Sequence, residues 1–436
     1  MWRLLLRRAM APIVLLLAFS AGPRLDARAP DRAAIVAQFE TDAQGQRGAR
    51  RRLGATRGIS MDDERALGID DVAALLARRD RFDADTALLF YAQTETGLNI
   101  YLVGDHLLEA ETAQKTPADI SWLALQLRAA LGVDDVVRSR APRKRGEVLA
   151  SEEIESPPDP GPAIRRLGAV LMPGRIGKAI EKVRHLLIVG NGEIGAIPFS
   201  LLRLPDGRLL VEQASVTFAP GLADIARPVA PWDGAAAFAQ ALVVGNPQTP
   251  DVPGWIVPPL AGAETEAKTL ANRIGVEPLI GRAATKAAII AAARHASLIY
   301  VAAHGIADPD DPLSRGYLML AGDAPATANW SAGEIQKMRL DASLAVLSAC
   351  QSGLGRRHDG GTIGLARAFQ LAGVPRVVMS LWSVGDESTA FLMDRFNRHA
   401  LSKNPAEALR LAMLDTRKRY RDAALWAPFA LFGTPR

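Results

Sequence analysis

The chain has 436 residues, of which 49% are hydrophobic and 23% charged, and its formal net charge at pH 7 is +5. This length and composition allow a large core and two or three domains, so we expect a globular protein. The basic excess is small, and three arginines (Arg3, Arg7 and Arg8) lie at the extreme N-terminus, so charge gives no argument for nucleic-acid binding.

The first 22 residues look like a secretory signal. Basic residues precede an apolar run from Ala9 to Ala21, which is too short for a comfortable membrane span. Small residues at Ala18 and Ser20 offer a cleavage position, and an uncleaved anchor is the alternative. We therefore expect residues 1–22 to be a signal peptide or anchor that exports the rest of the chain, as a periplasmic, secreted or membrane-anchored protein. A cytoplasmic protein is the alternative.

Residues 23–84 are expected to be a short helical and linker region. They are rich in Ala, Arg and Asp, and helical spacing recurs from Asp70 to Arg79. No internal period of a repeat protein is found there.

Residues 85–235 are expected to form a β-containing region. Ala87 to Val103 reads as two strands around a Thr-Gly turn, and Ala118 to Leu131 as an amphipathic helix. The basic stretch Arg138 to Arg145 and the proline-rich stretch Ser151 to Pro162 predict an exposed linker that proteases can reach.

His185 to Gly195 contains glycines in the spacing of a dinucleotide-binding fingerprint, with Glu212 about twenty residues further on. That fingerprint requires a helix to open at the glycines. Here Asn191-Gly192 favours a hairpin turn, and Pro198 favours strand or loop. The sequence therefore predicts a hairpin and no dinucleotide cofactor.

Residues 236–436 are expected to be a catalytic domain, because strands and helices alternate regularly from Ala241 onward. Such alternation predicts right-handed crossovers and a mostly parallel α/β sheet covered by helices on both faces. Strands are expected at Ala241–Gly245, Pro278–Ile280, Ser297–Ala303, Tyr317–Leu320, from Leu344, at Arg376–Trp382 and at Trp426–Phe432. Helices are expected at Gly262–Ile274, Thr285–His295, after the capping box Ser331 to Glu334, and at Gly364–Ala372, Glu387–Leu401 and Pro405–Tyr420.

Two apolar runs in this domain stop at reactive side chains: Leu298 to Gly305 contains His304, and Leu344 to Gly353 contains Cys350. The carboxyl ends of parallel strands meet at one edge of a sheet, so both side chains should face one crevice. Cys350 is the only cysteine in the chain, so it forms no internal disulfide. A lone cysteine is often only a small buried hydrophobe, but beside a histidine it predicts a catalytic dyad.

Six sequence blocks carry a family resemblance. They are L-L-I-V-G-N-G-E-I-G-A-I-P-F-S-L-L, V-A-A-H-G, L-S-A-C-Q-S-G, G-L-A-R-A-F-Q-L-A-G-V, S-L-W-S-V-G-D-E-S-T and W-A-P-F-A-L-F-G. Their order resembles the caspase-like cysteine peptidases, which include caspases, separases and gingipains, and more specifically the CHAT family. The resemblance covers residues 87–433 and implies a caspase-like α/β fold with a His/Cys dyad. That family often carries tetratricopeptide repeats ahead of this domain, and none is recognised here.

The implied mechanism assigns roles to four residues. Cys350 attacks a peptide carbonyl as thiolate, His304 is the general acid/base, and the backbone N–H groups of Gly305 and Cys350 stabilise the oxyanion. Asp386, just past the strand that should neighbour the cysteine strand, would bind a basic substrate side chain; a helix N-cap is its alternative role. Trp382 is expected in the core.

The sequence therefore predicts a cysteine endopeptidase that cleaves after a basic residue, with the loop Arg138 to Arg145 as a self-processing site. A catalytically silent CHAT-like scaffold and a cysteine-dependent acyl hydrolase or transferase are the alternatives. We expect a protein or peptide substrate, leave a regulatory protein partner open, and expect no cofactor, metal or nucleic acid. Membrane contact is expected only through an uncleaved N-terminal segment.

Overall fold

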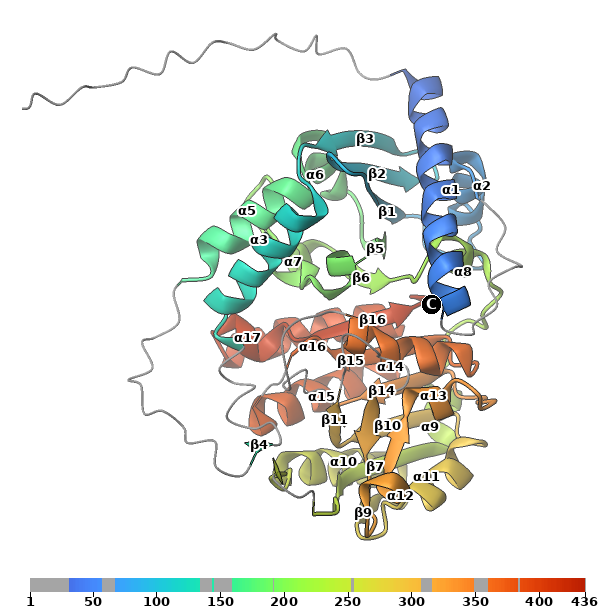
Figure 1. Ribbon diagram of the computed structural model, residues 1–436, viewed down its shortest axis with the longest axis vertical. Coiled ribbons are helices and arrows are strands. Elements are labelled where there is room, and N and C mark those ends of the chain that lie inside the picture. Colours follow the sequence, from blue (N-terminus) through green and yellow to red (C-terminus); the bar gives the residue numbers. More distant parts are fainter. Residues whose placement is uncertain are drawn as a thin grey trace, which may run out of the picture.

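The computed structural model describes residues 31–56, 67–133, 143–144, 159–190, 192–251, 255–306, 316–348, 360–382 and 385–435. These residues form one eleven-stranded sheet flanked by helices, with two small accessory sheets (Figure 1). Among them, no helix is both long and apolar enough to cross a membrane. The expected leader lies outside the described residues, so export of the chain stays a prediction.

The large sheet has the order β3-β2-β1-β5-β6-β16-β15-β14-β10-β7-β9. Seven of its ten strand pairings are parallel, which confirms the expected mostly parallel α/β sheet. Its strands are β1 (Thr86–Gln93), β2 (Leu98–Gly104), β3 (Leu108–Ala113), β5 (His185–Val189), β6 (Ser215–Phe218), β7 (Ala241–Pro247), β9 (Leu279–Gly281), β10 (Leu298–Ala302), β14 (Leu344–Leu347), β15 (Arg376–Ser380) and β16 (Phe429–Gly433).

The two accessory sheets are short. One has the order β11-β12-β13, and the other pairs β4 with β8. Their strands are β4 (Arg143–Lys144), β8 (Trp255–Ile256), β11 (His304–Ile306), β12 (Tyr317–Met319) and β13 (Asn329–Ser331). The rest of the basic stretch around β4 lies outside the described residues, so self-processing there stays a prediction.

The helices follow the expected periodicity in most of the chain, and the caps at Thr285 and at Ser331 with Glu334 are present. They are α1 (Arg32–Thr56), α2 (Ile69–Leu76), α3 (Pro117–Ala130), α5 (Gly161–Leu171), α6 (Gly174–Ile180), α7 (Leu210–Gln213), α8 (Leu222–Ala226), α9 (Gly234–Ala239), α10 (Ala261–Ile274), α11 (Lys286–Ala293), α12 (Pro325–Ala328), α13 (Ala332–Ile335), α14 (Gly360–Leu371), α15 (Asp386–Ala400), α16 (Pro405–Arg419) and α17 (Ala423–Trp426). Two 3-10 helices, η1 (Gly192–Ala196) and η2 (Phe199–Leu201), follow β5.

The central strands β10 and β14 are buried along their whole length. Both are continuous apolar runs rather than alternating ones, because helices cover both faces of a parallel sheet and leave no solvent-facing side. The burial of β10 fixes where His304, two residues beyond its end, lies relative to the sheet.

The expected hairpin at Asn191-Gly192 is wrong. β5 pairs in parallel with β1 on one side and with β6 on the other, and the chain then enters η1. Leu187, Ile188 and Val189 are all buried, so β5 is a central strand that needs a neighbour on each side. The positive φ of Gly192, +60°, opens a 3-10 turn instead of a hairpin.

The N-terminal region is also different from the expectation of short helices, because α1 is 25 residues long. Phe39 of α1 is fully buried and contacts the rings of Phe90 and Tyr101 edge-on, at 5.2 Å between ring centroids in both cases. α1 therefore covers the β1–β2 end of the sheet through a small aromatic core.

One sheet continues across both expected parts of the CHAT-like region, because β6 pairs in parallel with β16. The expected boundary between residues 235 and 236 falls inside α9. Whether the two regions fold independently on either side of this boundary stays a prediction. In the structure they share the main sheet.

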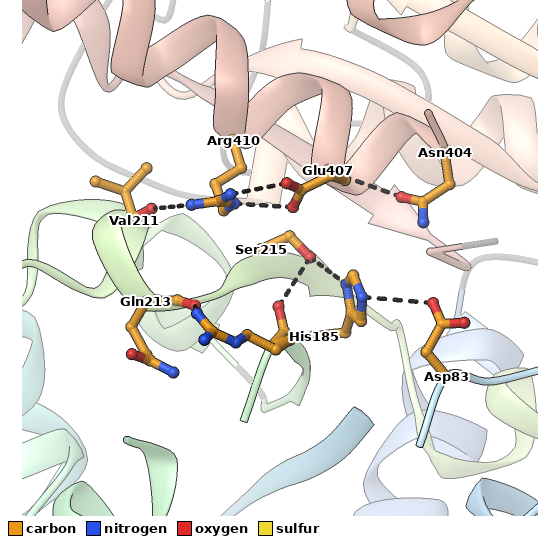
Figure 2. Close-up of polar contacts among 9 residues, drawn as sticks. Asp83, His185, Val211, Gln213, Ser215, Asn404, Glu407 and Arg410 are labelled. Atoms are coloured by element: carbon orange, nitrogen blue, oxygen red, sulfur yellow. Dashed lines mark hydrogen bonds and ion pairs between the residues drawn. The ribbon is translucent and has the colours of Figure 1, made fainter. Parts of the chain in front are cut away.

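Polar contacts join the start of β5 to the start of β6, and α16 to α7 through a hydrogen bond from Arg410 to the Val211 carbonyl (Figure 2). His185 Nδ1 lies 2.8 Å from the Ser215 hydroxyl, and Arg410 makes a two-pronged ion pair with Glu407. His185, Glu407 and Arg410 border a polar cleft of about 380 Å³. Because His185 and Ser215 begin their strands, this cleft lies at the sheet edge opposite the carboxyl ends.

Gly433→Ala should destabilise the fold by about 3 kcal/mol or more, because two effects combine. Gly433 has φ +118°, and an added Cβ would lie 1.9 Å from the Pro375 carbonyl oxygen. Gly207→Ala is the matched control, since Gly207 has φ +86° and open space around it. Urea unfolding should separate the two variants clearly. Equal midpoints would show that the contact with Pro375 relaxes at little cost.

Candidate active site

His304 lies just beyond the carboxyl end of β10 and is only 4% exposed. His304 was expected just after a strand at Ser297–Ala303, and the structure adds that it belongs to a second, short strand. β10 stops at Ala302, and His304 begins β11, which pairs antiparallel with β12. The break between β10 and β11 takes the histidine out of the main sheet while keeping it at that edge.

The imidazole of His304 is oriented by a backbone group. Its Nε2 lies 2.7 Å from the carbonyl oxygen of Pro258, just before α10. A carbonyl only accepts, so Nε2 carries the proton, and Nδ1 is the basic nitrogen of the neutral ring. Sequence analysis named no residue for this orienting role, because a main-chain carbonyl has no residue-type signature.

Cys350 lies outside the described residues. β14 is described as far as Leu347, which pairs with Val301 of β10. Gly305, the expected oxyanion donor, is the middle residue of β11 and is paired with Leu318. The dyad and the oxyanion donors therefore stay predictions.

Asp386 is the first residue of α15, and its alternative role as N-cap is wrong. Gly385 occupies the N-cap position. A carboxylate in the first turn still interacts favourably with the helix dipole. Trp382 is in the core, as expected: it is 1% exposed and its indole N–H donates to the Ala424 carbonyl.

The first turns of α10 and α15 are in close contact at Asp386. A Cβ added at Gly262 would lie 2.3 Å from the Cβ of Asp386, so only glycine fits there without displacement. α10 thus packs directly against the Cβ and backbone of Asp386, the proposed substrate-binding residue.

A buried carboxyl group lies one helical turn further along α10. Glu266 is 5% exposed, and its Oε1 accepts a 2.6 Å hydrogen bond from the fully buried Tyr300 hydroxyl. Burial raises the pKa of Glu266 to about 7; the hydrogen bond from Tyr300 and the Ser348 hydroxyl act against this shift, and the charge of Asp386 adds to it.

Sequence reasoning missed Glu266, although a signal was present. Ala263, Ala267 and Leu270 form the buried stripe of α10, and Glu266 falls within that stripe at helical spacing. A charged residue at a core position of an amphipathic helix marks a buried polar contact. Within the described part of the chain, no cluster of His, Cys, Asp or Glu is arranged to hold a metal ion.

The CHAT domain family matches residues 161–434 of this chain. Tetratricopeptide repeat protein 28 of Mus musculus is 26% identical over 301 residues, and that of Homo sapiens is 24% identical over 299 residues. Each match covers 58% of this chain and 12% of the relative. The chain thus spans about an eighth of the length of these curated relatives.

Solved structures of caspase-like cysteine peptidases are similar to this fold. A Saccharomyces cerevisiae separase–securin complex matches with a TM-score of 0.51 and 10% identity, over 94% of this chain and 34% of that chain. The Arg specific cysteine proteinase gingipain R matches with a TM-score of 0.41 and 15% identity, over 70% of this chain and 74% of that chain. The family match and the separase likeness confirm the expected family and fold.

Proposed function

The chain belongs to the CHAT domain family, and we propose that it is a cysteine endopeptidase whose reacting groups are His304 and Cys350. One observation carries the proposal. β10 and β14 are parallel neighbours in which Val301 pairs with Leu347, and the two reactive residues follow these by the same three positions. Adjacent parallel strands present the residues that follow them at one edge of the sheet, which supports a shared site.

The proposed reaction follows from the orientation of His304. With Nε2–H donating to Pro258, Nδ1 takes the thiol proton of Cys350, and the thiolate attacks the scissile carbonyl carbon. The tetrahedral intermediate is stabilised by the N–H groups of Gly305 and Cys350. It collapses when Nδ1 returns the proton to the leaving amine and the C–N bond breaks. Water then hydrolyses the thioester with Nδ1 as base and restores the thiol.

The substrate is proposed to carry a basic residue before the cut, bound by Asp386. Support comes from the position of Asp386 at the start of α15, directly after β15, which neighbours β14 in the sheet. A carboxylate at a helix N-terminus can pair with a cationic side chain through a charge-assisted hydrogen bond.

Protein partners are part of the proposal. The matched yeast separase is in complex with securin, and the curated relatives are named for tetratricopeptide repeats. Both are features of those proteins. By analogy, we propose that a protein substrate and a regulatory protein bind this chain at the same sheet edge.

A thiol-directed peptidyl probe with arginine next to the warhead tests the proposal. It should label the wild-type protein once, and it should not label Cys350→Ala, because Cys350 is the only cysteine in the chain. His304→Gln keeps the thiol but loses the base, so its labelling should slow by about 100-fold or more. Equal labelling of wild type and His304→Gln would show a merely reactive thiol and would contradict the dyad. Intact-protein mass spectrometry measures both rates.

A further inference from the structure

Glu266 is a buried carboxyl group that the proposed reaction does not use. The ion pairs of α10 in the described residues join Glu264 to Lys268 and Arg273 to Asp394, and none involves Glu266. A carboxyl group taken out of water without a cation is costly when ionised, so its charge depends on what lies near it.

Glu266 contacts the strand of the proposed base and lies close to that of the nucleophile. Its hydrogen-bond donor, Tyr300, is on β10, four positions before His304. Ser348 follows β14 and lies two positions before Cys350 in the sequence. Its hydroxyl also favours the ionised form of Glu266, although the two groups do not meet the geometry of an ordinary hydrogen bond. A change of charge at Glu266 therefore acts on both strands at once.

Glu266 also interacts electrostatically with Asp386. Gly262 touches Asp386 one turn before Glu266, and the negative charge of Asp386 disfavours ionisation of Glu266. The other charged group of α15 near this network is Asp394, which pairs with Arg273 and Arg398. Among the described elements, β7 also packs against α10, and it has no titratable side chain. Binding of a cation at Asp386 can therefore change the charge of Glu266.

We propose that Glu266 is a positioning residue that couples a cationic substrate side chain at Asp386 to the strands leading to His304 and Cys350. The inference rests on the proposed function. A cation beside Asp386 offsets the repulsion between the two carboxylates, so Glu266 releases its proton to solvent when a basic residue binds. The ionised carboxylate then accepts a stronger, charge-assisted hydrogen bond from Tyr300 and holds β10 more firmly. A neutral side chain leaves Glu266 protonated.

The sign of the pH dependence follows. Because cation binding releases a proton, affinity for a cation should reach its plateau above the pKa of free Glu266, about 7, and should fall as the pH drops below it. Ordinary carboxylates are fully ionised above pH 6, so measurements between pH 6 and 8.5 isolate Glu266 from them. His304 lies at the same edge of the sheet, so the pH profiles are compared between variants that all keep it.

Agmatine, a small guanidinium probe that cannot be cleaved, tests the inference by isothermal titration. Wild-type protein should bind it about fivefold more tightly at pH 8.5 than at pH 6, which corresponds to a fall of about one pKa unit on binding. Titrations in buffers of different ionisation enthalpy should show the released proton. Glu266→Gln should bind with little pH dependence and less proton release, whereas a purely structural role would alter stability and leave the pH profile unchanged.

Two more variants keep the test decisive. Asp386→Ala should lose agmatine binding. Tyr300→Phe should keep the proton release but move its midpoint to higher pH, because the ionised carboxylate loses a hydrogen bond; this variant serves if Glu266→Gln fails to fold. A wild-type pH profile in Glu266→Gln, or an unmoved midpoint in Tyr300→Phe, would overturn the inference. Absence of agmatine binding to wild type would also overturn it, while the dyad remains separately testable by probe labelling.

Discussion

Cys350→Ala and His304→Ala should each lower kcat/KM for peptide cleavage by about 10⁴-fold or more, and the double variant should be little worse than either. The reason is that the two groups act as one unit: without the base the thiol stays protonated, and without the thiol the base has nothing to activate. Turnover of a fluorogenic peptide with arginine before the cut measures this.

The controls address the buried position of His304. His304→Gln preserves a polar group that can still donate to the Pro258 carbonyl, so it should fold even where His304→Ala is destabilised. His295→Ala removes an exposed histidine nine positions earlier and should keep wild-type turnover. Thermal unfolding of all variants shows whether a loss of activity is a loss of fold. Wild-type turnover in purified, folded Cys350→Ala would refute the mechanism.

The local pattern of the sequence predicted the C-terminal half of the fold well. Continuous apolar runs specify buried parallel strands, and capping residues such as Thr285 and Ser331 specify where helices begin. The family blocks implied the caspase-like fold and the candidate site. His304 was therefore found at the correct sheet edge, although its start of a separate strand depends on pairing with β12, which local pattern does not encode.

Long-range contacts account for what the sequence did not predict. The pairing of β6 with β16 joins segments more than 200 residues apart, and no local pattern specifies it. The same holds for β5, whose Asn191-Gly192 end favours a hairpin locally but whose burial between β1 and β6 demands a parallel neighbour on both sides.

In the candidate site, too, sequence analysis found the residue that stands out by its type and missed those whose role depends on contacts in the fold. His304 was recognised because a histidine after a buried strand is chemically conspicuous. Pro258 contributes only a carbonyl, and Glu266 was overlooked because a glutamate in a helix is usually solvated. Its role depends on Tyr300 and Asp386, which come from other elements and meet it only in the folded chain.

Asp386→Ala should lower kcat/KM for substrates with arginine before the cut by a factor of between about 30 and several thousand. This corresponds to a loss of about 2 to 5 kcal/mol of transition-state stabilisation. Asp386 would pair with the guanidinium by a charge-assisted hydrogen bond, and without it the cation is desolvated with no partner. Substrates with a small apolar residue at that position make no such pair and should lose little. The variant should therefore lose its preference for arginine but should still cleave substrates with other residues before the cut.

Glu387→Ala is the matched control for Asp386→Ala. Glu387 is the next residue of the same helical turn, is exposed, and pairs with Arg419 on the surface, so its loss removes one carboxylate without touching the proposed pocket. Both variants are profiled on a peptide library that carries each amino acid in turn before the cut. The comparison separates the effect of the Asp386 carboxylate from the effect of any negative charge at this helix end. Wild-type preference for aspartate or for small apolar residues, unchanged in Asp386→Ala, would rule out the basic pocket. A loss of arginine preference in Glu387→Ala equal to that in Asp386→Ala would mean that the helix end attracts cations as a whole and that no single carboxylate selects the substrate.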